Sequence, residues 1–135
     1  MKALSILQPF ASAVAIGEKT IEVRTWNTNY RGPLLICASG KGCTVDDFFC
    51  PGGFALAVAE LVDVRRMERS DLSAAAMDIM PSNPSFAWVL RDAEEIEPFP
   101  VKGKLRLFDV EPPFLRILPE KFADHIDYFE RRWKT

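Results

Sequence analysis

The chain has 135 residues, a formal net charge of −2, 48% hydrophobic residues and 27% charged residues. This length predicts one domain, and this composition can bury a core without a metal or a disulfide. The three cysteines form no C-x-x-C pair, and the single histidine, His125, lies far from them in sequence. Neither a disulfide framework nor a zinc module is therefore expected, and no cofactor is implied.

No apolar run approaches the roughly 18 residues that span a bilayer. Gln8 and Pro9 interrupt the apolar N-terminal run, which makes it a poor signal peptide. The sequence thus predicts a cytoplasmic protein with reduced thiols and no membrane partner. Residues 44–100 carry eleven Asp and Glu against four Lys and Arg, whereas both ends of the chain are basic. The two ends could build one basic face, or the charges could form a mixed solvated surface.

In chain order, the first half predicts three strands and one helix. Residues 2–7 alternate like a short strand, and Pro9 suits the first turn of a helix that ends at Gly17. Residues 19–26 alternate again and are rich in β-branched residues, while residues 33–39 form an apolar strand. Residues 40–53 hold four glycines and a proline and are expected to form a loop.

The second half predicts three more strands and two helices. Residues 54–64 are the longest strand candidate, and Ser70 can cap a short helix over residues 71–80. Further strands are expected over residues 86–97 and 104–110. Pro119 opens a final helix over 119–133, whose apolar stripe is Phe122, Ile126, Phe129 and Trp133.

These elements predict a mostly β fold with helices, of the α+β class. About six short strands and three helices are expected, and the connections are too short for repeated βαβ crossovers. A small β-barrel or strongly curved sheet, flanked by helices that include a C-terminal one, accounts for this pattern.

The strand over residues 19–26 is unusually charged for a segment between two apolar ones. Ile21 and Val23 should face the core, with Lys19 at the mouth of the strand. The opposite face then presents Glu22, Arg24 and Trp26 to a cleft or to solvent. The alternative is a solvated edge strand, because exposed charge pairs across strands are common and stabilise little.

Glu60 falls in phase with the larger apolar face of its strand, where a carboxylate is costly unless it is paired. Lys19 or Arg24 is the expected partner. A structural salt bridge, or a bulge that turns Glu60 outward, is the alternative. Ser39 and Lys41 lie in a glycine-rich turn that could hold an anion, although it is not a nucleotide P-loop.

Five sequence blocks together resemble the ASCH family, whose fold is PUA-like. The blocks are "LSILQP", "GEKTIEVRTW", "YRGPLLICAS", "FAWVL" and "PFPVKGKLRLFDV". They run from Leu4 to about Val110, so the resemblance implies one ASCH domain over residues 1–135. Its family-like core would span 4–110, with an added C-terminal helix over 119–133. It also implies a barrel with a cleft on one side that binds RNA or nucleotides.

Carried over residue by residue, the resemblance implies a cleft lined by Lys19, Glu22, Arg24 and Gln8 and bordered by Arg31 and Ser39. Lysine and arginine can neutralise phosphate, and a carboxylate can accept from the exocyclic amine of a base. Trp26 and Tyr30 can stack on bases, which is how single-stranded RNA is typically read. Single-stranded RNA or a modified nucleoside is the expected ligand.

Two further readings stay open. A branch of the family deacetylates N4-acetylcytidine and reads G-x-K-T-I-T-I-R, whereas this chain has Glu22 at the position of the second threonine. A water-attack variant would use Glu22 or Glu60 as general base, with Lys19 polarising the carbonyl. Nuclease activity is suspected in some relatives, but this chain shows no compact carboxylate cluster for a metal pair. The third reading is a protein-interaction adaptor of the coactivator type.

Overall fold

The computed structural model describes residues 1–45 and 47–118, so the expected helix over 119–133 and its apolar stripe lie outside the described residues. No helix within these two ranges is both long and apolar enough to cross a membrane. In chain order the elements are β1 (Lys2–Leu7), α1 (Phe10–Ala15), β2 (Ile21–Arg24), β3 (Gly32–Ser39), β4 (Cys43–Val45), β5 (Phe48–Cys50), β6 (Phe54–Arg66), the 3-10 turn η1 (Arg69–Asp71), β7 (Phe86–Pro100) and β8 (Phe108–Asp109).

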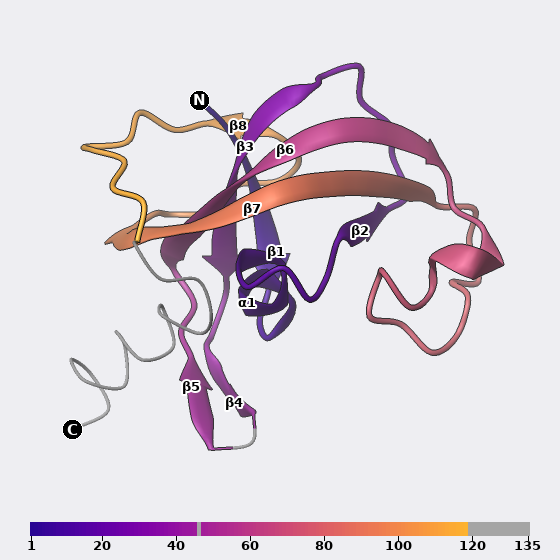
Figure 1. Cartoon of the computed structure of the whole chain (residues 1–135), viewed down its shortest axis with the longest axis horizontal. Coiled ribbons are helices and arrows are strands. Elements are labelled where there is room, and N and C mark those ends of the chain that lie inside the picture. Colours follow the sequence, from indigo (N-terminus) through magenta and orange to yellow (C-terminus); the bar gives the residue numbers. More distant parts are fainter. Residues whose placement is uncertain (46, 119–135) are drawn as a thin grey trace.

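Six strands form one curled sheet in the order β2-β7-β6-β3-β1-β8, and β4 and β5 form a separate two-stranded hairpin. Strands β1 and β3 are parallel, whereas the other pairs in the sheet are antiparallel. The long strands β6 and β7 run side by side across the molecule (Figure 1). Their pairing shifts register at three points, and such bulges bend and twist a sheet. The predicted strongly curved, mostly β fold is thus confirmed.

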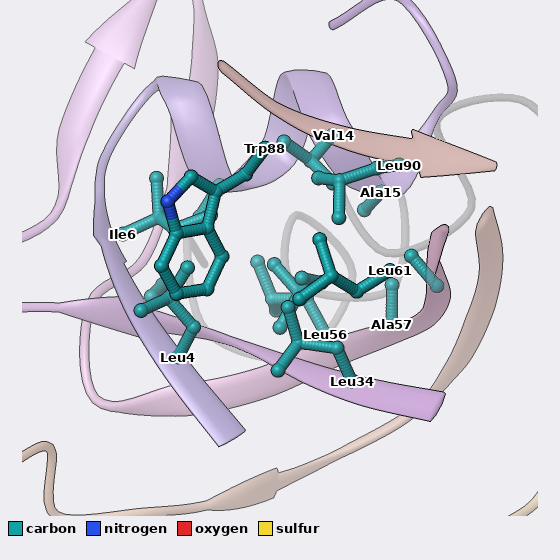
Figure 2. Packing of buried hydrophobic residues seen from close by; sticks show 14 of the residues in the cluster. Leu4, Ile6, Val14, Ala15, Leu34, Leu56, Ala57, Leu61, Trp88 and Leu90 are labelled. Atoms are coloured by element: carbon teal, nitrogen blue, oxygen red, sulfur yellow. The ribbon is translucent and has the colours of Figure 1, made fainter. Parts of the chain in front are cut away.

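The main core fills the concave side of the sheet and is closed by α1. Trp88 is fully buried there, and its indole N–H donates to the Trp26 carbonyl at 3.3 Å. The residues that α1 buries are small, which lets the helix approach the sheet closely. Figure 2 shows the Trp88 ring among the aliphatic side chains from β1, β3, β6 and α1 that surround it, with Leu4, Ile6, Val14, Leu34, Leu56, Leu61 and Leu90 labelled.

Bulges also decide where Glu60 lies. The residues of β6 that join the main core are Leu56, Ala57, Ala59, Leu61 and Val64, so strict alternation fails. Glu60 lies opposite Pro33 and Arg91, beside a register shift, and is half-buried. The expectation that Glu60 shares the core face and pairs with Lys19 or Arg24 was wrong, whereas the alternative, a bulge at Glu60, agrees with the register shift between Val58 and Glu60.

The segment over residues 40–53, expected to be a loop, contains the β4–β5 hairpin. Each strand of the hairpin contributes three paired residues. Asp47, which precedes β5, lies in the left-handed region at φ 68°. The glycines lie at the base of the hairpin rather than inside its strands. Strands this short carry too little periodicity to stand out beside so many glycines.

The helix expected over residues 71–80 reduces to η1 and a series of turns. Its cap is Glu68 rather than Ser70, in a reciprocal capping box with Asp71. The carbonyl of Ala74 accepts the N–H groups of Thr20 and Ile21 at 3.0 and 3.1 Å. Because this acceptor is bound to the chain entering β2, it is unavailable to an α-helix.

The strand expected over 104–110 is also shorter than predicted. Only Phe108 and Asp109 pair, with Ala3 and Lys2 of β1, whereas residues 101–107 form an irregular crossing in which Arg106 has φ 59°. Residues 103–106 of this segment instead form one wall of the cleft that is described below.

The Arg65–Asp71 pair yields a pH-dependent prediction. Arg65 donates two hydrogen bonds of 2.8 Å to the Asp71 carboxylate, and the Glu68 N–H donates a third. These bonds lower the pKa of Asp71 below its ordinary value of 3.8. Because the folded pKa lies below the unfolded one, this stabilisation is complete above about pH 4 and is lost as the pH falls through the folded value. Asp71→Asn should lower the free energy of unfolding by about 1–2 kcal/mol at pH 7. We expect no larger loss because Arg65 is partly exposed, and solvent weakens its ion pair with Asp71.

Urea unfolding of both proteins between pH 2.5 and 7 checks this difference, which should shrink below pH 3.8. Asp63→Asn is the matched control, since its carboxylate is 54% exposed and lies 3.9 Å from Arg31. A difference that stays constant down to the lowest pH would contradict the assignment.

Candidate functional site

A single open cleft of about 770 Å³ lies beside β2, between β1, α1 and the crossing segment. Its lining combines cations, aromatic rings and small polar groups. The residues that line it are Ser5, Ile6, Leu7, Phe10, Glu22, Val23, Arg24, Thr25, Trp26, Ser39, Gly40, Gly103, Lys104, Leu105 and Arg106.

Glu22 forms the floor of the cleft and is held by two cations. Its Oε1 lies 3.4 Å from Lys19 Nζ, and its Oε2 accepts from Arg24 Nε and Nη2 at 3.1 and 2.8 Å. The Glu22 side chain is 10% exposed. Glu22, Arg24 and Trp26, which the sequence places on one face, all line the cleft, and Val23 and Thr25 of the alternate face line it as well. A carboxylate this buried requires such partners.

Lys19 lies behind this floor and is 3% exposed. Its ammonium donates to the carbonyls of Ile21 at 2.7 Å and Ala75 at 2.6 Å, with Glu22 as the third neighbouring oxygen. Burial lowers the pKa of Lys19, and the Glu22 carboxylate opposes that shift. An ammonium has three donors, so this set of oxygens uses all of them. Lys19 holds β2 against the segment around Ala75 rather than lining the cleft.

The rim of the cleft carries a tryptophan with a cation above it. Trp26 is half-buried and packs edge-on against Trp88, with ring centroids 4.7 Å apart. The Arg106 guanidinium lies 5.0 Å from the centre of the Trp26 ring. Lys104 is exposed on the same wall. The Trp26 ring and two exposed cations, Arg106 and Lys104, therefore lie together at the rim of the cleft.

Ser5 and Gly103 meet where β1 and the crossing segment approach each other. Arg24 Nη2 donates to the Ser5 carbonyl at 2.8 Å, which ties β2 to β1 across the cleft. The Ser5 Oγ is buried and has no hydrogen-bond partner among the described residues. A Cβ at position 103 would lie 2.5 Å from that oxygen, so a larger residue there would force the Ser5 hydroxyl to turn away.

Several residues expected at the site lie elsewhere. Ser39 does line the cleft, but Lys41 is exposed in the turn before β4 and is not part of the lining. Gln8 donates to Ser12 Oγ and to the Pro51 carbonyl, both at 2.9 Å, and so braces the turn into α1. It does not line the cleft either.

Tyr30 and Arg31 form a local structure just before β3. The Tyr30 hydroxyl donates to the Pro33 carbonyl, and burial and the nearby Glu60 carboxylate raise its pKa. Arg31 donates to the carbonyls of Thr28 and Tyr30 at 2.9 and 2.8 Å. Tyr30, Arg31 and Glu60 are therefore not brought to the cleft with Glu22 and Arg24.

The crossing segment supplies the cleft residues that sequence reasoning missed, Lys104, Leu105 and Arg106, and β1 and α1 supply Ser5 and Phe10. The signal was present, since "KGKLR" places two cations beside a glycine. The alternation over residues 104–110 predicts a strand, however, and the side chains of a strand need not face a cleft. Among residues 1–45 and 47–118 no cluster of His, Cys, Asp or Glu could hold a metal ion.

Comparison with known proteins finds one family and one fold. The family profile described as ASCH domain matches residues 4–100. Activating signal cointegrator 1 of Mus musculus is 28% identical over 131 residues, and the match covers 80% of this chain but 22% of that protein. The chain therefore spans well under two thirds of this relative.

Two solved structures of an ASCH protein from Zymomonas mobilis have the same fold. The first superposes with a TM-score of 0.61 at 17% identity and covers 82% of this chain and 87% of that one. A tyrosine-to-phenylalanine mutant of it gives 0.60 at 17% identity, covering 82% and 89%. At this identity the likeness establishes the fold alone.

Lys19→Met tests the structural role of the buried amine. It leaves the carbonyls of Ile21 and Ala75 and one Glu22 oxygen without their donor. We expect a loss of about 3 kcal/mol in the free energy of unfolding, measured in urea. Lys104→Met, an exposed lysine on the cleft wall, is the control and should change it by less than about 0.5 kcal/mol. Equal stabilities of the two variants would show that Lys19 is not a structural anchor.

Proposed function

Because this chain belongs to the ASCH domain family, we propose that its cleft binds single-stranded RNA or a single nucleotide unit of it. The observation that carries this proposal is the arrangement at the rim. Trp26 lies there with the Arg106 guanidinium over its ring, and Lys104 adds positive charge on the same wall, so a base that stacks on this face of Trp26 would displace the guanidinium. Stacking on an aromatic ring and neutralisation of phosphate are the two interactions that sequence-tolerant binders of single strands combine.

The floor of the cleft is suited to the edge of a base. Glu22 accepts from Lys19 and Arg24, but a carboxylate offers about four lone-pair positions, so it retains capacity for one further donor. An exocyclic amine is such a donor. A nucleobase that enters past Trp26 would meet the Glu22 carboxylate on the floor of the cleft.

Hydrolysis of an acylated nucleoside is less well supported by this geometry. That mechanism asks Lys19 to polarise a substrate carbonyl, yet its ammonium already faces three protein oxygens. It also asks Glu60 or Glu22 to activate water, and Glu60 is not among the cleft residues. Absence of product from N4-acetylcytidine with the wild-type protein would reject this alternative.

Protein interaction is the second candidate, and a specific feature favours it. Three large apolar side chains are exposed around the same rim: Leu7 at 65%, Phe10 at 41% and Leu105 at 93%. Exposed apolar groups gathered in one patch are typical of contact surfaces. The relative described as a cointegrator agrees with this reading. It predicts a purified protein partner whose binding is lost in Leu105→Ser and retained in Arg106→Gln; loss in neither variant would reject it.

Binding of a labelled single-stranded oligoribonucleotide, followed by fluorescence anisotropy, tests the first proposal. The affinity should fall as salt rises, since contacts to phosphate release counterions. Trp26→Ala should weaken binding by about tenfold to a hundredfold, because loss of stacking costs about 1–3 kcal/mol per base. Arg106→Gln should weaken binding and also reduce the dependence on salt.

Arg69→Gln is the matched control, because this exposed arginine lies in η1 and does not line the cleft. It should bind as the wild type does. Binding that is independent of salt, or equal losses in Arg69→Gln and Arg106→Gln, would contradict the proposed cleft.

A further inference from the structure

The β4–β5 hairpin projects away from the sheet (Figure 1). Its first leg follows Ser39 and Gly40, which line the cleft, and its second leg returns through Pro51, whose carbonyl accepts from Gln8 at 2.9 Å. The two legs meet at their base, since a Cβ on Gly52 would lie 2.0 Å from the Gly40 carbonyl oxygen. The hairpin is therefore joined to the cleft wall through Ser39 and Gly40 and to the turn before α1 through Pro51.

Two cysteines face each other across this hairpin. Cys43 of β4 and Cys50 of β5 are directly opposed in the antiparallel register. Residues paired in this way have Cα atoms about 4.5–5.5 Å apart and side chains on the same face of the strands. A disulfide needs a Cα separation of about 4.4–6.8 Å. We propose that Cys43 and Cys50 are a reversible modification site, at which a small-molecule disulfide such as oxidised glutathione installs an intramolecular crosslink.

The burial of the cysteines assigns their roles. Cys43 is half-buried and so can be reached by a reagent, whereas Cys50 is 3% exposed. Cys43 is therefore the attacking thiol and Cys50 the resolving one. Cys37 lies in β3, is 1% exposed, and burial raises its pKa to about 12. Because the thiolate is the reactive form, Cys37 serves as an internal unreactive reference.

The reaction is an exchange of two thiols for one disulfide. The Cys43 thiolate attacks one sulfur of oxidised glutathione, forming a mixed disulfide and releasing one glutathione thiolate, which takes up the proton lost by Cys43. The Cys50 thiolate then attacks the Cys43 sulfur and releases the second glutathione in the same way. The protein loses two hydrogen atoms, and oxidised glutathione becomes two molecules of the thiol. Excess reduced glutathione reverses both steps.

Such a crosslink would tie the two legs of the hairpin together where they leave the cleft wall. Residues opposed in a sheet need little backbone movement to be bridged, so the six-stranded sheet should be unaffected. The neighbouring positions most constrained would be Ser39 and Gly40.

The test treats the full chain with oxidised glutathione, then alkylates the remaining thiols and measures the intact mass. The wild type should lose two hydrogen atoms, keep one alkylatable thiol, and yield a peptide in which Cys43 is joined to Cys50. Cys37→Ser should behave as the wild type apart from that remaining thiol. Cys50→Ser should instead accumulate the glutathione adduct on Cys43, because nothing resolves it.

Cys43→Ser should form neither the adduct nor the crosslink at a comparable rate, and Cys43→Ala serves as a second variant if the serine protein does not fold. Circular dichroism of each variant confirms folding. A wild type that retains glutathione on Cys43, crosslinks through Cys37, or forms only disulfide-linked dimers would overturn the proposal. No nucleic acid is used, so the outcome is independent of the binding experiment.

Discussion

The arrangement of this site depends on one buried carboxylate. Glu22 lies between Lys19 and Arg24, and each cation carries a second connection to the protein. Lys19 binds the carbonyl of Ala75, and Arg24 binds the carbonyl of Ser5. The short strand β2 is thereby joined to the η1 region on one side and to β1 on the other. Removing Glu22 would leave two partly buried cations unpaired, which is more costly than losing an exposed pair.

This arrangement divides the positive charge of the cleft into two groups with different roles. Lys19 and Arg24 are committed to Glu22 and to backbone carbonyls, so they set the shape of the floor. Lys104 and Arg106 are exposed on the crossing segment and have no carboxylate partner among the described residues within ion-pair distance. A ligand anion would meet the second group first. The distinction explains why substitutions at position 19 and position 106 should affect different measurements.

The crossing segment is as important to the cleft as β2. It lies against β1 where Gly103 fits beside Ser5, and it then directs Arg106 over the Trp26 ring. Trp26 is itself held by Trp88, the largest fully buried side chain of the core. The packing of the main core therefore supports the rim of the cleft, and a substitution of Trp88 would act on the site through its contact with the Trp26 ring.

The sequence was sufficient for the fold class, the family and the edge strand β2 that lines the cleft. Period-2 alternation identified the strands of the sheet, and "GEKTIEVRTW" placed Glu22, Arg24 and Trp26 together because neighbours at i and i+2 share a face. It could not locate the bulges of β6, since a bulge changes which residues face inward without changing composition. That is why Glu60 was assigned to the wrong face.

Only the tertiary structure decided how residues distant in sequence meet. Ala74 and Ala75 lie in a segment with helical propensity, yet their carbonyls accept from residues 19–21, and that competition has no local signature. In the same way, Lys104 and Arg106 reach the cleft because the chain crosses beside Ser5 instead of pairing as a strand. Local pattern determines the period of a segment, whereas packing against remote partners determines which of its polar groups are bound and which remain available to a ligand.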